Sequence, residues 1–182
     1  MIETVDYYEN LEKEIVEGLD QEQISMGFER LNFHVGLRKA TYYLIGGYTG
    51  SGKTSFLDDA FVLNPFDFIN SDKNTKGIKL KVFYFSMERR KNYKIGKWIS
   101  RKIFLDTGKI ISVNKILGWV SPEYKLTPDE HDIVKSYKDY INFMLNDAVT
   151  IIENPQNPMG IKKTIDAYAE LNGVKEKIDA HN

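Results

Sequence analysis

The amino-acid sequence predicts an α/β domain with a largely parallel sheet, because runs of β-prone residues alternate with amphipathic segments. Three runs rich in branched and aromatic residues predict strands at 40–45, 81–86 and 149–153. Glycine stops the first run, and polar loops or predicted helices separate the others. Consecutive strands linked through helices normally pair in parallel, which is the basis for the predicted fold class.

Apolar residues at three- and four-residue spacing predict the helices. They cover residues 4–20, 54–63, 91–105, 127–145 and 157–172. Pro65 is predicted to end the second helix, and Thr127-Pro128-Asp129-Glu130 has the pattern of a capping box. In residues 91–105, one face is predicted to be buried (Ile95, Trp98, Ile99, Ile103) and the other solvated (Lys94, Lys97, Arg101). Trp119 is also predicted to be a core residue.

Composition excludes several classes of protein. The 182 residues include no cysteine, which rules out disulfides, thiol nucleophiles and cysteine-ligated zinc. No apolar run is long enough to span a membrane, and the acidic N-terminus lacks the apolar core of a secretory signal. We therefore expect a cytoplasmic protein with no membrane partner, and the lysine-, asparagine- and isoleucine-leaning composition suggests a bacterial cell or a phage-infected host.

Charge divides the chain into two predicted parts. Of its 25 basic and 26 acidic residues, one base and eight acids lie in residues 1–22, so residues 23–182 carry a net charge of +6. We predict an acidic amphipathic helix in residues 1–22 and a mildly basic domain in residues 23–182. Such a domain could bind a polyanion.

Residues 47–54 match the phosphate-binding pattern G-x-x-x-x-G-K-[ST] at every fixed position. Glycines let the backbone turn tightly and point N–H groups at phosphate oxygens, and the following helix adds its positive end. Lys53 is predicted to reach the β- and γ-phosphates of ATP, and the Thr54 hydroxyl to coordinate Mg²⁺. The predicted nucleotide site comprises Gly47, Tyr48, Thr49, Gly50, Ser51, Gly52, Lys53, Thr54 and the following Ser55.

Glu88 follows the second predicted strand, within Ser86-Met87-Glu88-Arg89. Ligands of parallel sheets gather at the carboxyl ends of the strands. A carboxylate there could orient or deprotonate the water that attacks a γ-phosphate. Spacing alone favours the interpretation of Glu88 as a polar residue that leaves a strand.

Several stretches together resemble the ATPase domain of DnaB-like replicative helicases. They are Gly27-Phe28-Glu29-Arg30-Leu31-Asn32, then Gly36-Leu37, the loop at 47–54 and the segment FYFSMER at 83–89. The resemblance covers about residues 25–172, although Met26 and Asn32 stand where the family usually has threonine and aspartate. It implies a RecA-like P-loop fold in which Glu88 is the catalytic glutamate.

The resemblance also implies a function. By this resemblance, ATP with Mg²⁺ is expected to be hydrolysed between subunits of a homo-oligomeric, hexameric ring that translocates on single-stranded DNA and unwinds duplex DNA. A primase or a helicase loader is a possible partner, and residues 4–20 resemble the linker helix that grips a neighbouring subunit. The family's Walker B aspartate, arginine finger and DNA-contacting loops are expected beyond Asn182, so residues 23–182 are expected to form a partial domain.

Alternatives stay open from the sequence. Glu153 follows Ile151-Ile152 and is a second candidate for a metal-site acid, whereas Asp179 lacks the preceding apolar strand. The basic run from Arg89 to Lys102 could be a solvated helix face, a subunit interface or a DNA contact. The chain could belong to another RecA-type ATPase, such as a recombinase or signalling ATPase. It could also be a catalytically incomplete nucleotide-binding or assembly module, or a small-molecule P-loop kinase.

Overall fold

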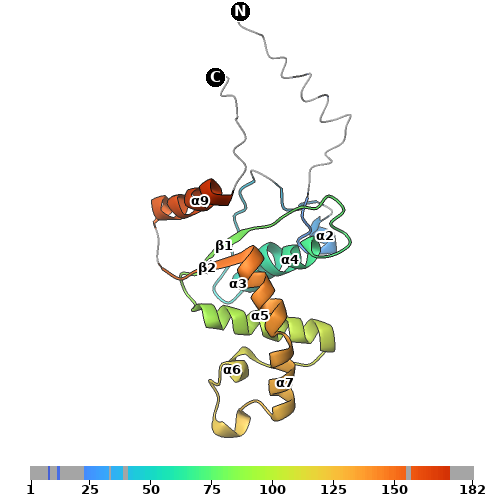
Figure 1. Ribbon diagram of the computed structural model, residues 1–182, viewed down its shortest axis with the longest axis vertical. Coiled ribbons are helices and arrows are strands. Elements are labelled where there is room, and N and C mark those ends of the chain that lie inside the picture. The colour runs from blue at the N-terminus through green and yellow to red at the C-terminus, as the bar shows by residue number, and fades with distance from the viewer. Residues whose placement is uncertain are drawn as a thin grey trace, which may run out of the picture. The chain divides into compact units, whose positions relative to one another are not determined.

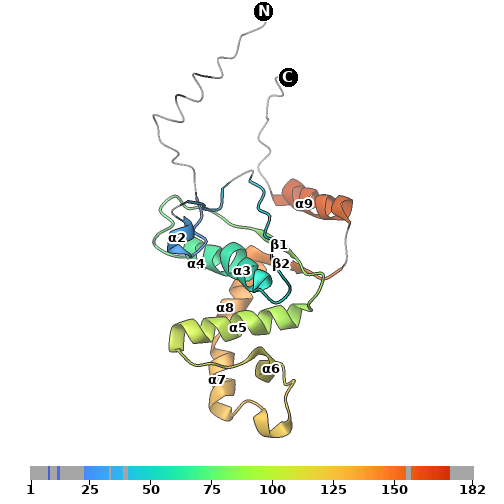
Figure 2. The same cartoon turned by 180° about the vertical axis from the view of Figure 1, so that it is seen from behind.

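The computed structural model describes Tyr8, Glu12 and residues 23–32, 34–38, 41–154 and 157–172. The chain divides into two compact units, Met1–Leu80 and Lys81–Asn182, and each unit is described here by itself. The helix predicted at 4–20 and the residue Asp179 fall outside the described residues, apart from Tyr8 and Glu12. Figures 1 and 2 show the elements from opposite sides.

The first unit is built around one helical run. It begins with α3 (Lys53–Asp58), continues through the π-helix η1 (Asp59–Leu63) and ends with α4 (Asn64–Ile69). The prediction that Pro65 ends this helix is wrong, because Pro65 lies in the first turn of α4. Proline lacks an N–H group and its ring crowds the carbonyl four residues earlier. The wider turn of the π-helix just before it accommodates both effects.

The lead-in segment packs on this helical run. Gly27 has a φ of 78°, and a Cβ there would overlap the side chain of Asn64, so the position requires glycine. The Asn64 amide donates a hydrogen bond to the Met26 carbonyl at 2.7 Å. In α2 (Glu29–Asn32), the Asn32 side-chain oxygen accepts a hydrogen bond from the Met26 N–H at 2.9 Å. Met26 is thereby held from both sides and is buried.

The strand predicted at 40–45 is not formed in the described residues 41–45. Tyr42 and Leu44 are 86% and 83% exposed, whereas the Tyr43 ring packs edge-on against Phe61 at 5.4 Å. The Tyr43 hydroxyl also donates a hydrogen bond to the Gly36 carbonyl at 2.6 Å. β-prone residues favour extended backbone, but a strand needs a partner to supply hydrogen bonds and burial, and local sequence cannot encode that partner.

The second unit contains a parallel pair of strands, β1 (Val82–Phe85) and β2 (Val149–Ile152). Val82 pairs with Val149 and Phe85 with Ile152, and the Ser86 N–H continues the ladder to the Ile152 carbonyl at 2.9 Å. These pairs confirm the second and third predicted strands and their parallel direction. The structure is therefore α/β, with two strands among the described residues.

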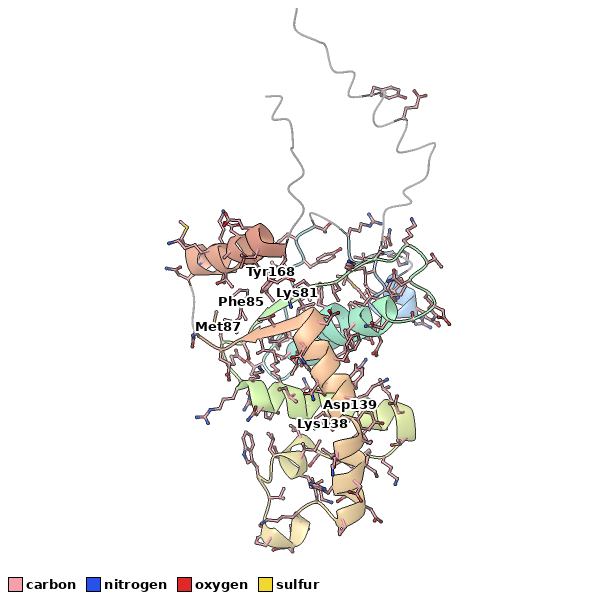
Figure 3. All side chains as sticks on the ribbon, viewed as in Figure 1. Lys81, Phe85, Met87, Lys138, Asp139 and Tyr168 are labelled. Carbon is pink, nitrogen blue, oxygen red and sulfur yellow. The ribbon has the colours of Figure 1, made fainter. Side chains whose placement is uncertain are left out.

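Helices cover both faces of this sheet, as Figures 1 and 2 show. Tyr84 meets Trp98 of α5 (Lys91–Thr107) with 5.9 Å between ring centroids. Phe83, the neighbouring residue of β1, meets Tyr168 of α9 (Pro158–Asn172) at 5.1 Å. Successive strand residues point to opposite faces, so α5 and α9 cover opposite sides. Figure 3 also shows Tyr168 beside Lys81, whose ammonium lies 5.2 Å from the ring centroid.

The helix predicted at 91–105 is confirmed as α5, which ends where Gly108 adopts a φ of 71°. Trp98 and Ile103 are buried, as predicted. Lys94 was predicted to be solvated, and that prediction is wrong because it is only 2% exposed. Its ammonium donates a hydrogen bond to the Tyr84 hydroxyl at 2.5 Å and lies 4.7 Å from the centroid of that ring. A partner on the sheet compensates for the burial of this charge, and helical periodicity does not reveal such a partner.

The segment between α5 and β2 contains short helices. They are α6 (Val113–Ile116), the 3₁₀ helix η2 (Pro122–Tyr124), α7 (Pro128–Ser136), α8 (Lys138–Phe143) and the π-helix η3 (Met144–Ala148). The predicted capping box is present, since Thr127 and Glu130 each accept a hydrogen bond from the other's backbone N–H. The prediction that Trp119 belongs to the core is wrong, because its side chain is 59% exposed between α6 and η2.

Glu130 makes the stability of this segment dependent on pH. The Lys115 ammonium, 2.6 Å from the Glu130 carboxylate, and the Thr127 N–H lower the pKa of Glu130 below its ordinary 4.5. A depressed folded-state pKa contributes stability that is present above pH 4.5 and is lost as the pH falls through the folded-state value. We expect Glu130→Gln to lower the urea midpoint at pH 7, and we expect this difference to vanish on acidification. An unchanged difference at low pH would contradict the assignment.

Candidate nucleotide-binding site

Residues 47–52 form an irregular loop that leads directly into α3, whose first residues are Lys53 and Thr54. Gly50 and Gly52 have φ values of 80° and 85°, in the left-handed region that favours glycine. A Cβ built at Gly47 would lie 2.8 Å from the Ser51 hydroxyl oxygen, so this glycine also allows a close approach. The two fixed glycines of the motif, Gly47 and Gly52, and also Gly50 between them therefore stand where a side chain would be crowded or strained.

Lys53 closes the loop. Its ammonium donates hydrogen bonds to the carbonyl oxygens of Gly47 and Tyr48, both at 2.7 Å. The Ser51 N–H also donates to the Tyr48 carbonyl, at 3.2 Å. The lysine is thus held across the loop by two backbone carbonyl oxygens.

The residues present fit a magnesium nucleotide. No heavy atom comes within 4 Å of a Cβ built at Gly50 or Gly52, so the outer side of the loop is open. The first N–H groups of the helical run that starts at Lys53 lack partners within the helix, which favours an anion there. Thr54 is exposed in the first turn and offers the kind of oxygen that Mg²⁺ accepts. Tyr48, Thr49 and Ser55 are also exposed.

The structure places Glu88 in an exposed turn just after the carboxyl end of β1. The Ser86 hydroxyl donates a hydrogen bond to the Arg89 carbonyl at 2.5 Å, which closes the turn, and α5 starts two residues later at Lys91. Figure 3 shows Met87, the neighbour of Glu88, where the strand ends. The turn therefore presents Glu88 at the strand edge predicted from the sequence. The phosphate-binding loop belongs to the first unit and Glu88 to the second.

Glu153 has a role in this turn that the sequence did not reveal. Its carboxylate accepts a hydrogen bond from the Lys91 N–H at 2.7 Å, so a residue after β2 caps the first turn of α5. A negative charge at a helix N-terminus is also favourable electrostatically. The helix's own N-cap residue, Arg90, makes no side-chain capping bond, and this lack of a local cap is the one signal that pointed to a distant one.

This cap can be tested by changing Glu153. Glu153→Ala is expected to destabilise the chain by about 0.5–2 kcal/mol, the usual cost of losing a helix cap. Glu153→Gln keeps an acceptor oxygen and is expected to restore most of that loss. Urea unfolding followed by circular dichroism measures both. If instead both variants unfold like the parent chain but lose stabilisation by Mg²⁺ equally, Glu153 acts as a metal-site acid and not as a cap.

Among the described residues, no group of three or more histidine or acidic side chains is placed to hold a metal ion. No helix in the described part of the chain is long and apolar enough to cross a membrane. Comparison of the chain with protein-family models, with curated proteins and with solved structures gave no match.

Proposed function

We propose that this chain binds ATP with Mg²⁺ through Gly47–Ser55 and forms part of the RecA-like ATPase core of a DnaB-like replicative DNA helicase. The observation that carries the proposal is the loop itself. A complete phosphate-binding motif leads into a helical run, its glycines Gly50 and Gly52 adopt left-handed conformations, and Lys53 is held across it.

The proposed chemistry assigns a role to each side chain. The Lys53 ammonium exchanges its two carbonyl partners for phosphate oxygens and neutralises their charge. The Thr54 hydroxyl is a ligand of Mg²⁺. The Glu88 carboxylate orients the attacking water and accepts its proton. ATP supplies the phosphoanhydride bond whose hydrolysis drives movement.

The second part of the proposal is that the chain acts on DNA. The support is the resemblance of the lead-in at Gly27–Asn32 and of the Ser86-Met87-Glu88 turn to the helicase family. Parallel pairing of β1 and β2, with Glu88 directly after β1, is compatible with that architecture. In this proposal the chain acts within a homo-oligomeric ring that translocates on single-stranded DNA, and a primase or loader is a further partner.

ATP turnover by the chain, with and without single-stranded DNA, tests the proposal. Turnover that DNA stimulates supports a helicase core, whereas turnover indifferent to DNA favours another RecA-type ATPase. Magnesium-dependent ATP binding without turnover means that residues 1–182 form an incomplete catalytic module. Absence of both binding and turnover in a folded chain refutes the proposal.

A further inference from the structure

Three side chains near the start of α5 form a continuous contact. The Tyr93 ring is stacked with the ring of Trp119, with 6.0 Å between centroids and 22° between the ring planes. The Arg89 guanidinium carbon lies 5.0 Å from the centroid of the same Tyr93 ring. Arg89 precedes the helix, Tyr93 lies in its first turn and Trp119 follows α6. We call these three residues the Arg89–Trp119 platform.

The outer member of the platform is open to solvent. Trp119 is 59% exposed, although tryptophan is among the residues that gain most from burial, whereas Trp98 of the same unit is buried in the core. The loop that carries Trp119 is ordered by a hydrogen bond from its own N–H to the Asn114 carbonyl at 2.8 Å. An aromatic ring is therefore held in a defined orientation while much of its surface stays in water.

Positive charge lies at the start of α5, the helix that carries Tyr93 of the platform. Arg89, Arg90 and Lys91 are consecutive and exposed at the start of α5. The Glu153 carboxylate accepts a hydrogen bond from the Lys91 N–H, and Glu88 precedes Arg89 in the same turn. An exposed aromatic ring beside several cations is the combination that proteins use for single-stranded nucleic acids, because bases stack on the ring while cations attract phosphates.

We infer that the Arg89–Trp119 platform is a binding site for single-stranded DNA, at which a base stacks on Trp119 and the neighbouring cations attract the phosphates. The geometry indicates a single-stranded nucleic acid, and the inference rests on the proposed function for the choice of DNA as that nucleic acid. It does not require a working ATPase site. For Arg89, Arg90 and Lys91, the first three basic residues of the run at 89–102, the inference selects a DNA contact over a solvated helix face.

Tryptophan fluorescence gives a direct readout, because the chain contains two tryptophans. In a Trp98→Phe variant, Trp119 is the sole reporter, and we expect oligothymidylate to quench it. An abasic oligonucleotide of equal length, which retains phosphates but has no bases, is expected to quench it much less. Equal quenching by the two oligonucleotides, or no quenching, would overturn base stacking. ADP that quenches Trp119 and competes with oligothymidylate would assign the platform to a free nucleotide instead.

A second experiment measures binding of a labelled oligothymidylate by fluorescence anisotropy. It uses the chain with Trp98 intact, so it does not depend on the folding of the Trp98→Phe variant. Trp119→Ala is expected to weaken binding roughly 5- to 150-fold, as for removal of one base-stacking ring. Trp119→Phe should recover most of the affinity, and Tyr124→Ala, which removes another exposed ring, should leave it unchanged. Equal effects of Trp119→Ala and Tyr124→Ala would refute the platform. Lys53→Ala should not alter this binding, so failure of the ATP site and failure of the platform are distinguishable.

Discussion

Lys53→Ala is expected to weaken binding of magnesium ATP roughly 10- to 150-fold, the usual cost of losing one charge-assisted hydrogen bond. If the chain hydrolyses ATP, turnover should fall roughly 100- to 1,000-fold, as when one preorganised donor to a developing charge is removed. The reason is geometric, because the ammonium already lies within 2.7 Å of two oxygens of the loop and needs only to exchange acceptors. Isothermal titration calorimetry with ATP and Mg²⁺ measures the change in ATP affinity directly.

Lys73→Ala is the matched control for this experiment. Lys73 is an exposed lysine of the first unit, outside the phosphate-binding loop, and its removal subtracts the same charge from the chain. ATP affinity should be unchanged in this variant. A Lys53→Ala chain that binds ATP as tightly as the Lys73→Ala chain would show that the loop does not hold phosphate. The assignment of Thr54 to Mg²⁺ would then also be withdrawn.

Glu88→Gln is expected to separate binding from chemistry. The amide keeps the size and polarity of the side chain but is not a base, so turnover should fall roughly 100- to 10,000-fold. ATP affinity should change little, because the proposed contacts to phosphate come from Lys53 and the loop. A single-turnover measurement at saturating ATP gives the chemical step, and a binding titration gives the affinity.

Glu123→Gln is the matched control for Glu88, because Glu123 is an exposed glutamate of the same unit, in η2. It should hydrolyse ATP at the parent rate. If Glu88→Gln also retains the parent rate, Glu88 is a polar residue of the turn and the water is activated by another base. A loss of ATP affinity equal to the loss of turnover would instead indicate that Glu88 acts in binding.

The elements that the sequence predicted correctly depend on short-range physical signals. β1 and β2 are four-residue runs of β-prone side chains, and α5 starts and ends where its predicted periodicity does, within two residues. The capping box at Thr127 is a local hydrogen-bond pattern, so a four-residue segment is enough to specify it. The left-handed conformations of Gly50 and Gly52 in the loop at 47–52 are local in the same sense, because each concerns only its own backbone angles.

Apart from Pro65, which the adjacent π-helix accommodates, the incorrect predictions concern contacts with residues elsewhere in the fold. The run at 40–45 has the composition of a strand, but no strand forms there in the described residues because Tyr43 is anchored to Gly36 and Phe61 instead. Lys94 is buried because Tyr84 of the sheet faces it. Trp119 is exposed because packing against Tyr93 covers only part of the tryptophan ring. Composition and periodicity do not reveal which residues these side chains contact in the folded chain.

The sequence by itself determined the position of the glycine-rich loop at 47–52, the two strands in the described part of the chain and the helices that cover them, since each depends on neighbouring residues. Tertiary structure decided what happens at the ends of those elements. It placed the Glu153 carboxylate at the first turn of α5 and set Trp119 against Tyr93. Residues more than 20 positions apart meet there through folding, and only the folded backbone specifies their distance and orientation.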